Sequence, residues 1–300
     1  MNRFSGARPS ATVSVDVDGV DLHLAGYGHQ NLPPDSAVYG VALSRILDIL
    51  ARHSVRATFF VVGRDAEGQS TMLRQMVAAG HELAAHSMTH PPVFSRMPAS
   101  QLAHEVTESR RVLAAATGSD VVGFRAPNWD LDRAAIPTLA SAGYRYDASG
   151  FPSLFQIAAR GLLAIKSRQL DPLVSMNLWP FTMRRLPHLL SAGESALGEF
   201  PISVTPVIRW PIYHTVRYMI DSRRFETQLD GFVRRREPFF YPLHAIDGLG
   251  LREDRADPRL AGHPGMDRSL EEKLDILNRA VEAIAARFDC APYRDLTRLV

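Results

Sequence analysis

Residues 12–18 have the sequence Thr-Val-Ser-Val-Asp-Val-Asp, in which polar side chains alternate with valines. Side chains on a β-strand point alternately to its two faces, so Asp16 and Asp18 share one face. In a barrel of parallel strands, the valines would pack outward against helices, and the small Thr12 and Ser14 would fill the interior. The two carboxylates would then lie at the carboxyl end of the strand, at the mouth where barrel enzymes carry their chemistry. Two acids at a strand end can also simply cap the loop that follows.

Four later stretches also place ionisable residues where a strand is expected to end. They are His86-Ser87-Met88-Thr89-His90, Arg125-Ala126-Pro127, Tyr146-Asp147 and Leu243-His244. Because the carboxyl ends of parallel strands meet at one mouth, we interpret these stretches and the two aspartates as one hydrolytic metal site.

Strand-like and helix-like segments alternate along the chain, which is typical of a parallel sheet or barrel. The pattern predicts strands at 12–17, 57–62, 82–85, 121–124, 144–147, 199–204 and 239–243. It predicts helices at 39–53, 71–79, 99–116 and 132–142, with Gly80 and Gly143 at helix ends. A final helix at about 269–288 begins with the capping-box spacing of Ser269 and Glu272 and carries one apolar stripe.

Length, charge and cysteine content limit the class of protein. The chain has 300 residues, 46% of them hydrophobic, which predicts a single domain over 1–300 with a core at about 12–245. A formal net charge of +2 gives no electrostatic case for nucleic acid. The single Cys290 suits a reducing compartment. Residues 1–11 contain no apolar leader, and no run approaches the roughly 18 apolar residues of a membrane span, so we expect a cytoplasmic protein.

The spacing of His86 and His90 favours a metal site. Four residues apart, the two histidines can face one ion if a turn of helix or a compact loop follows the strand at 82–85. Together with Asp18 they would form a two-imidazole, one-carboxylate set for a catalytic divalent ion, with zinc as the leading candidate. Ser87 follows His86 where a zinc-protease helix would carry its glutamate base. Asp16, on the same strand face as Asp18, is the natural general base.

The motifs taken together resemble those of a known family. Asp16-Val17-Asp18, Ala-Thr-Phe-Phe-Val-Val-Gly at 57–63, Gly-His-Glu-Leu-Ala-Ala-His-Ser-Met-Thr-His at 80–90, Arg125-Ala126-Pro127 and Leu243-His244 are similar in kind and order to the polysaccharide deacetylases (carbohydrate esterase family four). The resemblance covers roughly 12–245. It implies a distorted (β/α) barrel of about seven parallel strands and metal-dependent hydrolysis of an N-acyl group, usually the N-acetyl group of an amino sugar.

The resemblance also implies a role for each matching residue. Asp16 resembles the family's catalytic base, and Arg125 the residue that holds this base in place and keeps it ionised. Asp18, His86 and His90 resemble the ligands of one divalent metal, for which zinc, cobalt, nickel and iron stay open. His244 resembles the general acid that protonates the leaving nitrogen. A backbone N–H of the loop after Pro127, that of Asn128, is expected to stabilise the oxyanion.

Two departures from the family pattern bear on the substrate. Val17 separates the two aspartates, a variant that resembles intracellular members acting on small amides or lipid-linked sugars. The fourth motif, Tyr146-Asp147-Ala148-Ser149, has no tryptophan, so we expect Trp129, Trp179 or Trp210 to replace it in the pocket wall. Asp147 is expected to tune His244, to pair with Arg125, or simply to end its strand.

The segment at about 151–218 is the least typical part of the chain. It mixes apolar stretches with basic residues and has almost no acids before Glu194. It is either an insertion that packs on its own barrel or a surface that lies on an anionic membrane. The loop containing His263 is either a lid over the site or the lead-in to the last helix. His23 and His29 are either substrate contacts or surface histidines.

The sequence is compatible with three functions. The first is N-deacetylation of an amino-sugar glycan or its lipid-linked precursor. A lipid-linked precursor would be processed at the inner face of a membrane. The second is a deformylase or small-amide or ureide hydrolase of the same fold. The third is a sugar-binding or membrane-associated module without catalysis, against which the presence of Asp16, Asp18, His86, His90 and His244 argues.

Overall fold

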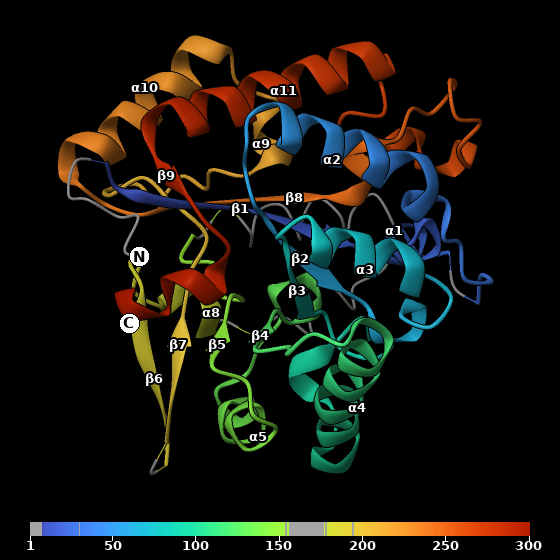
Figure 1. Ribbon diagram of the computed structural model, residues 1–300, viewed down its shortest axis with the longest axis vertical. Coiled ribbons are helices and arrows are strands. Elements are labelled where there is room, and N and C mark those ends of the chain that lie inside the picture. The colour runs from blue at the N-terminus through green and yellow to red at the C-terminus, as the bar shows by residue number, and fades with distance from the viewer. Residues whose placement is uncertain (1–7, 30, 154, 156–176, 178, 194) are drawn as a thin grey trace.

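Parallel strands form the centre of the fold (Figure 1). The computed structural model describes residues 8–29, 31–153, 155, 177, 179–193 and 195–300. Within these residues the strands form one sheet in the order β6-β7-β5-β4-β3-β2-β1-β8, with β9 paired to β1. Neighbouring strands run parallel except for the antiparallel pair β6 and β7. The strands are β1 (Ser10–Val17), β2 (Thr58–Val61), β3 (Glu82–Ala85), β4 (Gly123–Phe124), β5 (Tyr146–Asp147), β6 (His188–Ala192), β7 (Ser195–Glu199), β8 (Phe239–His244) and β9 (Asp289–Cys290).

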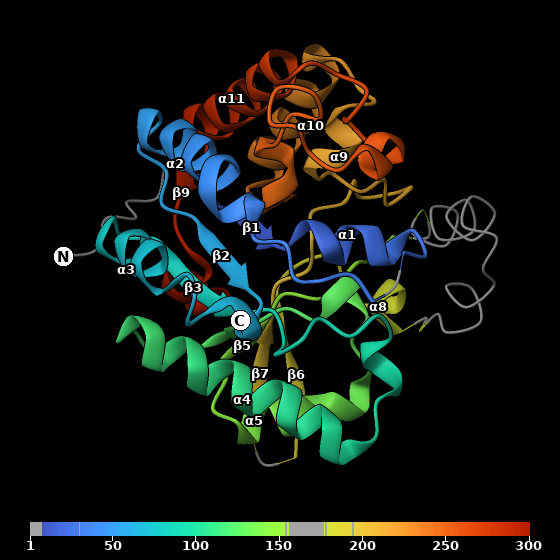
Figure 2. The same cartoon turned by 90° about the vertical axis from the view of Figure 1, so that its right-hand side faces the viewer.

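Helices surround the strands, as Figure 2 shows for α11, α2, α3, α4 and α5. The described helices are α1 (Val20–Gly26), α2 (Leu43–Arg52), α3 (Ser70–Ala78), α4 (Ala99–Thr117), α5 (Ile136–Ser141), α8 (Trp179–Thr182), α9 (His214–Arg217), α10 (Ser222–Arg235) and α11 (Leu270–Arg287). The predicted capping box of α11 is confirmed, because the Ser269 hydroxyl accepts from the Glu272 N–H while the Glu272 carboxylate accepts from the Ser269 N–H. Gly80 and Gly143 have φ angles of +87° and +89°, as expected of residues that end helices.

The sheet curls into a distorted barrel. Beyond β7 the chain reaches β8, where the Ser203 N–H donates to the Phe240 carbonyl (3.3 Å) and the Phe240 N–H donates to Ser203 Oγ (2.8 Å). These two bonds link the ends of the sheet across the gap between β7 and β8. The predicted fold class, a distorted (β/α) barrel with about seven parallel strands, is therefore confirmed.

The alternation predicted for residues 12–18 is confirmed as well. Val13, Val15 and Val17 are fully buried in the large core shared with the helices. Thr12 and Ser14 are fully buried on the other face, and Thr12 Oγ1 donates to the Ala291 carbonyl (2.8 Å). A second cluster fills the interior, partly from the chain after β9: Phe60, Ala84, Val122, Tyr146, Ala148, Phe200, Phe240, Ala291, Tyr293 and Leu296.

The strand predicted at 199–204 is wrong in its position. The strand in the structure is β7, which ends at Glu199 opposite Asp147. Pro201 has no N–H to donate to a ladder, so regular pairing with β5 stops there. The chain beyond runs across the mouth of the barrel, where Val204 forms a single antiparallel bridge with Pro211.

Helices α1 and α10 were not predicted from the sequence. Helix α10 buries Phe225, Leu229 and Phe232, a stripe of three apolar residues that is hard to detect among four arginines. The predicted helices at 39–53 and 132–142 begin differently. Residues Val38–Ala42 form a π-helical turn before α2, and a 3₁₀ turn at Arg133–Ala135 precedes α5.

Much of the atypical segment at 151–218 lies outside the described residues, including most of the apolar and basic stretches that suggested a membrane surface. Its described part contains α8, β6, β7 and α9, which pack on the barrel. Within the described chain, no helix has the length and apolar character needed to cross a bilayer. Contact with a membrane stays a prediction.

Candidate active site

The two aspartates of β1 lie at the carboxyl-end mouth of the barrel. The register of β1 with β8 sets Asp16 opposite His244, and His244 Nε2 lies 4.0 Å from Asp16 Oδ2. Asp16 and Asp18 are only 2% and 5% exposed. The pairing of β1 with β8 is therefore enough to place the Asp16 carboxylate beside the His244 imidazole.

Arg125 fixes the position of Asp16 through hydrogen bonds. Its Nη1 donates to Asp16 Oδ1 at 2.5 Å, its Nη2 to Ser14 Oγ at 3.2 Å, and its Nε to the Ala148 carbonyl at 2.9 Å. The guanidinium carbon lies 4.0 Å from the centre of the Phe60 ring. Arg125 is fully buried. Burial acts to raise the pKa of Asp16, but the charge and hydrogen bond of Arg125, together with His86 and His244, outweigh it, and the pKa is lowered from its usual value. The carboxylate is thus ionised and fixed in orientation.

Asp18, His86 and His90 converge, as predicted. One ligand atom from each lies within 4.8 Å of the others. Asp18 Oδ1 is 3.4 Å from His86 Nε2 and 3.6 Å from His90 Nε2, and it has no hydrogen-bond partner among the described residues. A buried carboxylate oxygen without a partner is costly unless a cation binds it. The predicted metal set is therefore assembled in a form that fits a divalent ion.

The orientation of His86 supports the same conclusion. Its Nδ1 lies 2.8 Å from the Arg125 carbonyl, which can only accept a hydrogen bond. The proton is therefore on Nδ1, and the Nε2 lone pair faces Asp18 and His90. Burial lowers the pKa of His86 and lowers that of His90 to about 4, so both rings are neutral at neutral pH. Neutral imidazoles are the form that binds metals.

Glu105 of α4 supports the His86–His90 loop and was not predicted. Its carboxylate accepts from the backbone N–H groups of Met88 (2.8 Å) and Thr89 (2.9 Å) and from Thr89 Oγ1 (2.6 Å). Ser87 and His90 have φ angles of +61° and +57°, which non-glycine residues seldom adopt. Backbone of this kind persists where the surroundings enforce it, as at functional sites.

His244 is held through Asp247, which also was not predicted. The His244 N–H donates to Asp247 Oδ2 (2.9 Å), and the His244 ring accepts from the Asp247 N–H. Tyr218 donates its hydroxyl to the second carboxylate oxygen of Asp247 (3.0 Å). The reciprocal pair resembles a helix capping box and fixes the ring beside Asp16.

Comparison with known proteins shows which family this chain resembles. The model of the family described as polysaccharide deacetylase matches residues 35–146. A chitooligosaccharide deacetylase of Bradyrhizobium sp. is 39% identical over 98 residues, which are 33% of this chain and 45% of that protein. A peptidoglycan deacetylase of Helicobacter pylori is 30% identical over 139 residues, which are 45% of this chain and 47% of that protein. These matches cover part of the chain, which in that part resembles the polysaccharide deacetylase family.

Solved structures of low identity show the same fold along the whole chain. A Mycobacterium smegmatis protein assigned to the polysaccharide deacetylases has a TM-score of 0.65 at 18% identity and covers 99% of this chain and 92% of that one. The PuuE allantoinase has a TM-score of 0.59 at 16% identity, with 98% and 91% covered. In sequence, however, the chain spans only about half the length of the curated relatives it matches.

Asp147, in the fourth motif, makes neither of the two contacts expected of it. Its two carboxylate oxygens accept from the hydroxyl (2.7 Å) and the N–H (2.8 Å) of Ser149, and no bond to His244 or Arg125 is found among the described residues. Ser149 Oγ in turn accepts from the Ala126 N–H (2.8 Å). The carboxylate therefore braces the loop that carries Arg125, because the chain turns at the end of β5 and brings Ser149 nearer than either predicted partner.

Among the three tryptophans considered for the pocket wall, Trp129 is the one beside His244. The two ring centres are 5.7 Å apart with an interplanar angle of 85°. Trp129 also contacts Phe151 and Tyr213 edge to face, at 5.4 and 6.1 Å. Trp179 packs against the main core, and Trp210 contacts Phe155 at 4.3 Å. Asn128 and Trp129 have φ angles of +55° and +53° at the mouth, and the oxyanion role of the Asn128 N–H stays a prediction.

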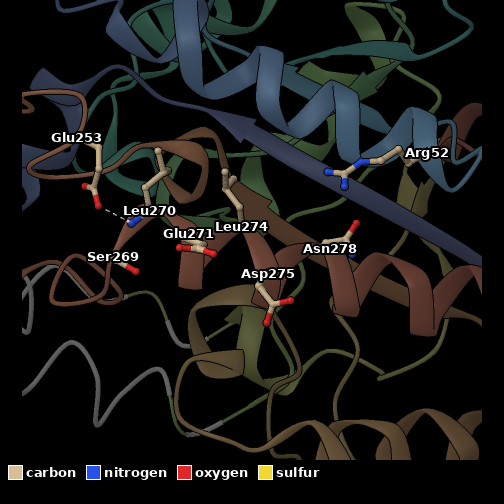
Figure 3. Close-up of a pocket in the computed structure, with 8 residues that line it drawn as sticks. All are labelled: Arg52, Glu253, Ser269, Leu270, Glu271, Leu274, Asp275 and Asn278. Atoms are coloured by element: carbon tan, nitrogen blue, oxygen red, sulfur yellow. Dashed lines mark hydrogen bonds between the residues drawn. The ribbon is translucent and has the colours of Figure 1, made fainter.

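A groove of about 600 Å³ lies elsewhere on the protein, between the end of α2 and the start of α11. Figure 3 shows three acidic residues that line it, Glu253, Glu271 and Asp275, with Arg52 at the opposite end from Glu253. None of the predicted site residues lines this groove. The chemistry is therefore assigned to the barrel mouth and not to this groove.

Acidification is expected to destabilise the protein between about pH 6.5 and pH 4. Burial lowers the pKa of His81 and of His214 from 6.5 to about 4 in the folded chain. The neutral His81 ring accepts from the Ala57 N–H, and His214 Nδ1 bonds the Tyr241 hydroxyl. The unfolded chain binds more protons in this range, so the free energy of unfolding falls as the pH falls, by about 1.4 kcal/mol per unit for each histidine.

Urea unfolding of the metal-free protein at pH 7 and pH 5 checks this expectation. The two histidines together should lower the free energy of unfolding by about 3 kcal/mol at the lower pH. The double variant His81→Gln/His214→Gln should lose most of that difference, whereas His104→Gln, exposed on α4, should keep it. Equal pH dependence in all three proteins would contradict the assignment.

Proposed function

We propose that this protein is a metal-dependent N-deacetylase that acts on an amino-sugar glycan, an oligosaccharide of amino sugars, or their lipid-linked precursor. The observation that carries the proposal is the position of the ionised Asp16. It shares a strand face with Asp18 of the metal set and lies 4.0 Å from the His244 ring. Base, acid and metal ligands thus surround one point at the barrel mouth. The chitooligosaccharide and peptidoglycan deacetylases among its relatives support the choice of an acetylated amino sugar.

Asp18, His86 and His90 would hold the ion, because their ligand atoms converge and Asp18 Oδ1 has no other partner among the described residues. Once bound, a divalent ion would polarise the amide carbonyl and acidify water. Zinc fits the two-imidazole, one-carboxylate set, and cobalt, nickel or iron would fit it as well.

Asp16 acts as the general base in this scheme. Arg125 helps to offset the rise in the pKa of Asp16 that burial causes, so the carboxylate is already ionised. It can therefore take the proton of the attacking water without first losing one of its own. His244, positioned by Asp247, accepts the Asp247 N–H at one ring nitrogen and carries its proton on Nε2. It would donate this proton to the nitrogen of the breaking C–N bond and regain the one that Asp16, 4.0 Å away, takes from water. The products are the free amine and the carboxylate, acetate for an acetyl group, so one water is consumed for each bond cleaved.

Acetate release from acetylated sugars tests the proposal. The metal-loaded protein is incubated with an N-acetylglucosamine oligomer and with peptidoglycan fragments, and acetate is measured enzymatically. We expect release from at least one of these substrates and none from allantoin, the substrate class of a hydrolase with the same fold. Turnover of allantoin alone, or of no amide, would reject the deacetylase proposal.

A further inference from the structure

Two histidines that the proposed mechanism does not use lie at the side of His244. The ring centre of His23 is 5.7 Å from that of His244 and 5.0 Å from that of His263, both in edge-to-face contact. The Tyr27 hydroxyl lies 3.1 Å from His263 Nδ1. We call His23, Tyr27 and His263 the histidine wall. It joins α1, which directly follows the two aspartates, to the 3₁₀ turn at Pro258–Gly262.

Helix α1 is fixed firmly enough to define where His23 points. Val20 and Leu24 are buried in the main core. Asp21 accepts from the Asp35 N–H (3.0 Å) and from Arg64 Nη2 (2.5 Å). A side chain at Gly19 would place its Cβ 2.7 Å from the Asp35 carbonyl oxygen, so only glycine permits this close approach. The His23 ring is therefore held by the fold, and its place at the site is not an accident of a loose surface.

One nitrogen of His23 is left without a partner. Nε2 is buried, and no described residue forms a hydrogen bond with it. Burying an unpaired polar atom costs free energy, so such an atom beside reacting groups points to a ligand that satisfies it. A second metal ion is not that ligand, because within the described chain the ligand atoms of Asp18, His86 and His90 alone come close enough together.

The charge state of the wall favours a neutral ligand. Burial, together with His263 and His244, lowers the pKa of His23 well below its usual value, and burial lowers that of His263 to about 4. Burial raises the pKa of Tyr27 to about 12, so the phenol keeps its proton. At neutral pH each imidazole then offers one N–H donor and one lone pair. A sugar hydroxyl, which both donates and accepts, matches such a group better than an anion does.

We propose that His23 is a specificity residue whose Nε2 binds a ring hydroxyl of the amino sugar next to the N-acyl group being cleaved. His263, held by Tyr27, fixes the His23 ring from its far side. The inference rests on the proposed function, since it assumes a sugar at Asp16 and His244. It goes beyond the proposed function because a contact to a sugar hydroxyl would make the enzyme prefer an amino sugar over a small amide or ureide with the same scissile bond.

The test compares two acetyl amides on the full, metal-loaded chain. One is an N-acetylglucosamine oligomer, and the other is acetanilide, which has no hydroxyl. The variant His23→Phe keeps an aromatic ring but removes the hydrogen bond, His23→Gln keeps a donor and an acceptor, and His104→Phe is the exposed control. We expect His23→Phe to raise KM for the oligomer about tenfold with kcat little changed, and to leave acetanilide unaffected. His23→Gln should recover part of the loss.

A binding measurement separates this inference from the proposed function. The oligomer is titrated calorimetrically into metal-loaded Asp16→Asn, with and without His23→Phe, and the second change should weaken Kd about tenfold. If the wild type releases no acetate but binding depends on His23, the deacetylase proposal fails and the sugar contact stands. If acetate is released but His23→Phe leaves KM and Kd unchanged, the contact is rejected. Equal losses on both amides with a lower Tm, or no binding of the oligomer at all, would reject it too.

Discussion

Asp16→Asn should lower kcat for acetate release by about 10²–10⁴, the range for loss of a general base. Asparagine has nearly the same shape as aspartate and can still accept from Arg125, but it cannot take a proton from water. Among the described residues, Asp18 belongs to the metal set and Asp147 is bonded to Ser149, so neither is free to take its place. The measurement is steady-state release of acetate from the substrate found for the wild type, at equal metal content.

The matched control is Asp48→Asn, which makes the same chemical change on the exposed face of α2 and should leave kcat unchanged. Asp16→Asn should also bind about as much metal as the wild type, because Asp16 is not in the ligand set. Activity within tenfold of the wild type would show that another group takes the proton.

Asp18→Ala should remove both metal and activity. The substitution deletes the single carboxylate of the set and leaves two imidazoles, which hold a divalent ion much more weakly. We expect the metal content, measured by elemental analysis after zinc loading and removal of the excess, to fall from about one ion per chain to a small fraction. Acetate release should fall at least about a thousandfold, since the water then has no Lewis acid.

His90→Ala should give the same result, whereas His104→Ala, exposed on α4, should keep both metal and activity. Chelation of the wild type should abolish activity, and addition of zinc should restore it. A wild type that binds no ion, or an Asp18→Ala variant that keeps its ion, would reject this ligand set.

Much of the site follows from residues close together in the sequence. The alternation over 12–18 sends Asp16 and Asp18 to one face of a strand, and the four-residue spacing of His86 and His90 suits a compact loop. Parallel strands bring their carboxyl ends together, so the meeting of these stretches at one mouth also follows from the predicted fold. The structure confirms that Asp16, Asp18, His86, His90, Arg125 and His244 meet there, while their roles remain to be tested.

Other partners were not predicted, either because a local bond replaces the expected one or because the contact depends on packing. Asp147 was expected at His244 or Arg125, yet its oxygens bond Ser149, two residues away. Glu105 supports the metal loop from the inner face of α4, where a carboxylate cannot be told from an ordinary helix glutamate. The strand expected at 199–204 lies several residues earlier, because register depends on which residues face one another across the sheet.

The sequence by itself determined the barrel, the first strand and the set of residues gathered at its mouth, because period, capping and strand direction are local properties of the chain. Only the tertiary structure decided that Trp129 is the tryptophan beside His244, and that the His23 ring lies next to it with a nitrogen that no described residue bonds. These contacts join elements separated by up to hundreds of residues. Their geometry is fixed by how helices and loops close over the sheet, and side-chain periodicity carries no information about that closure.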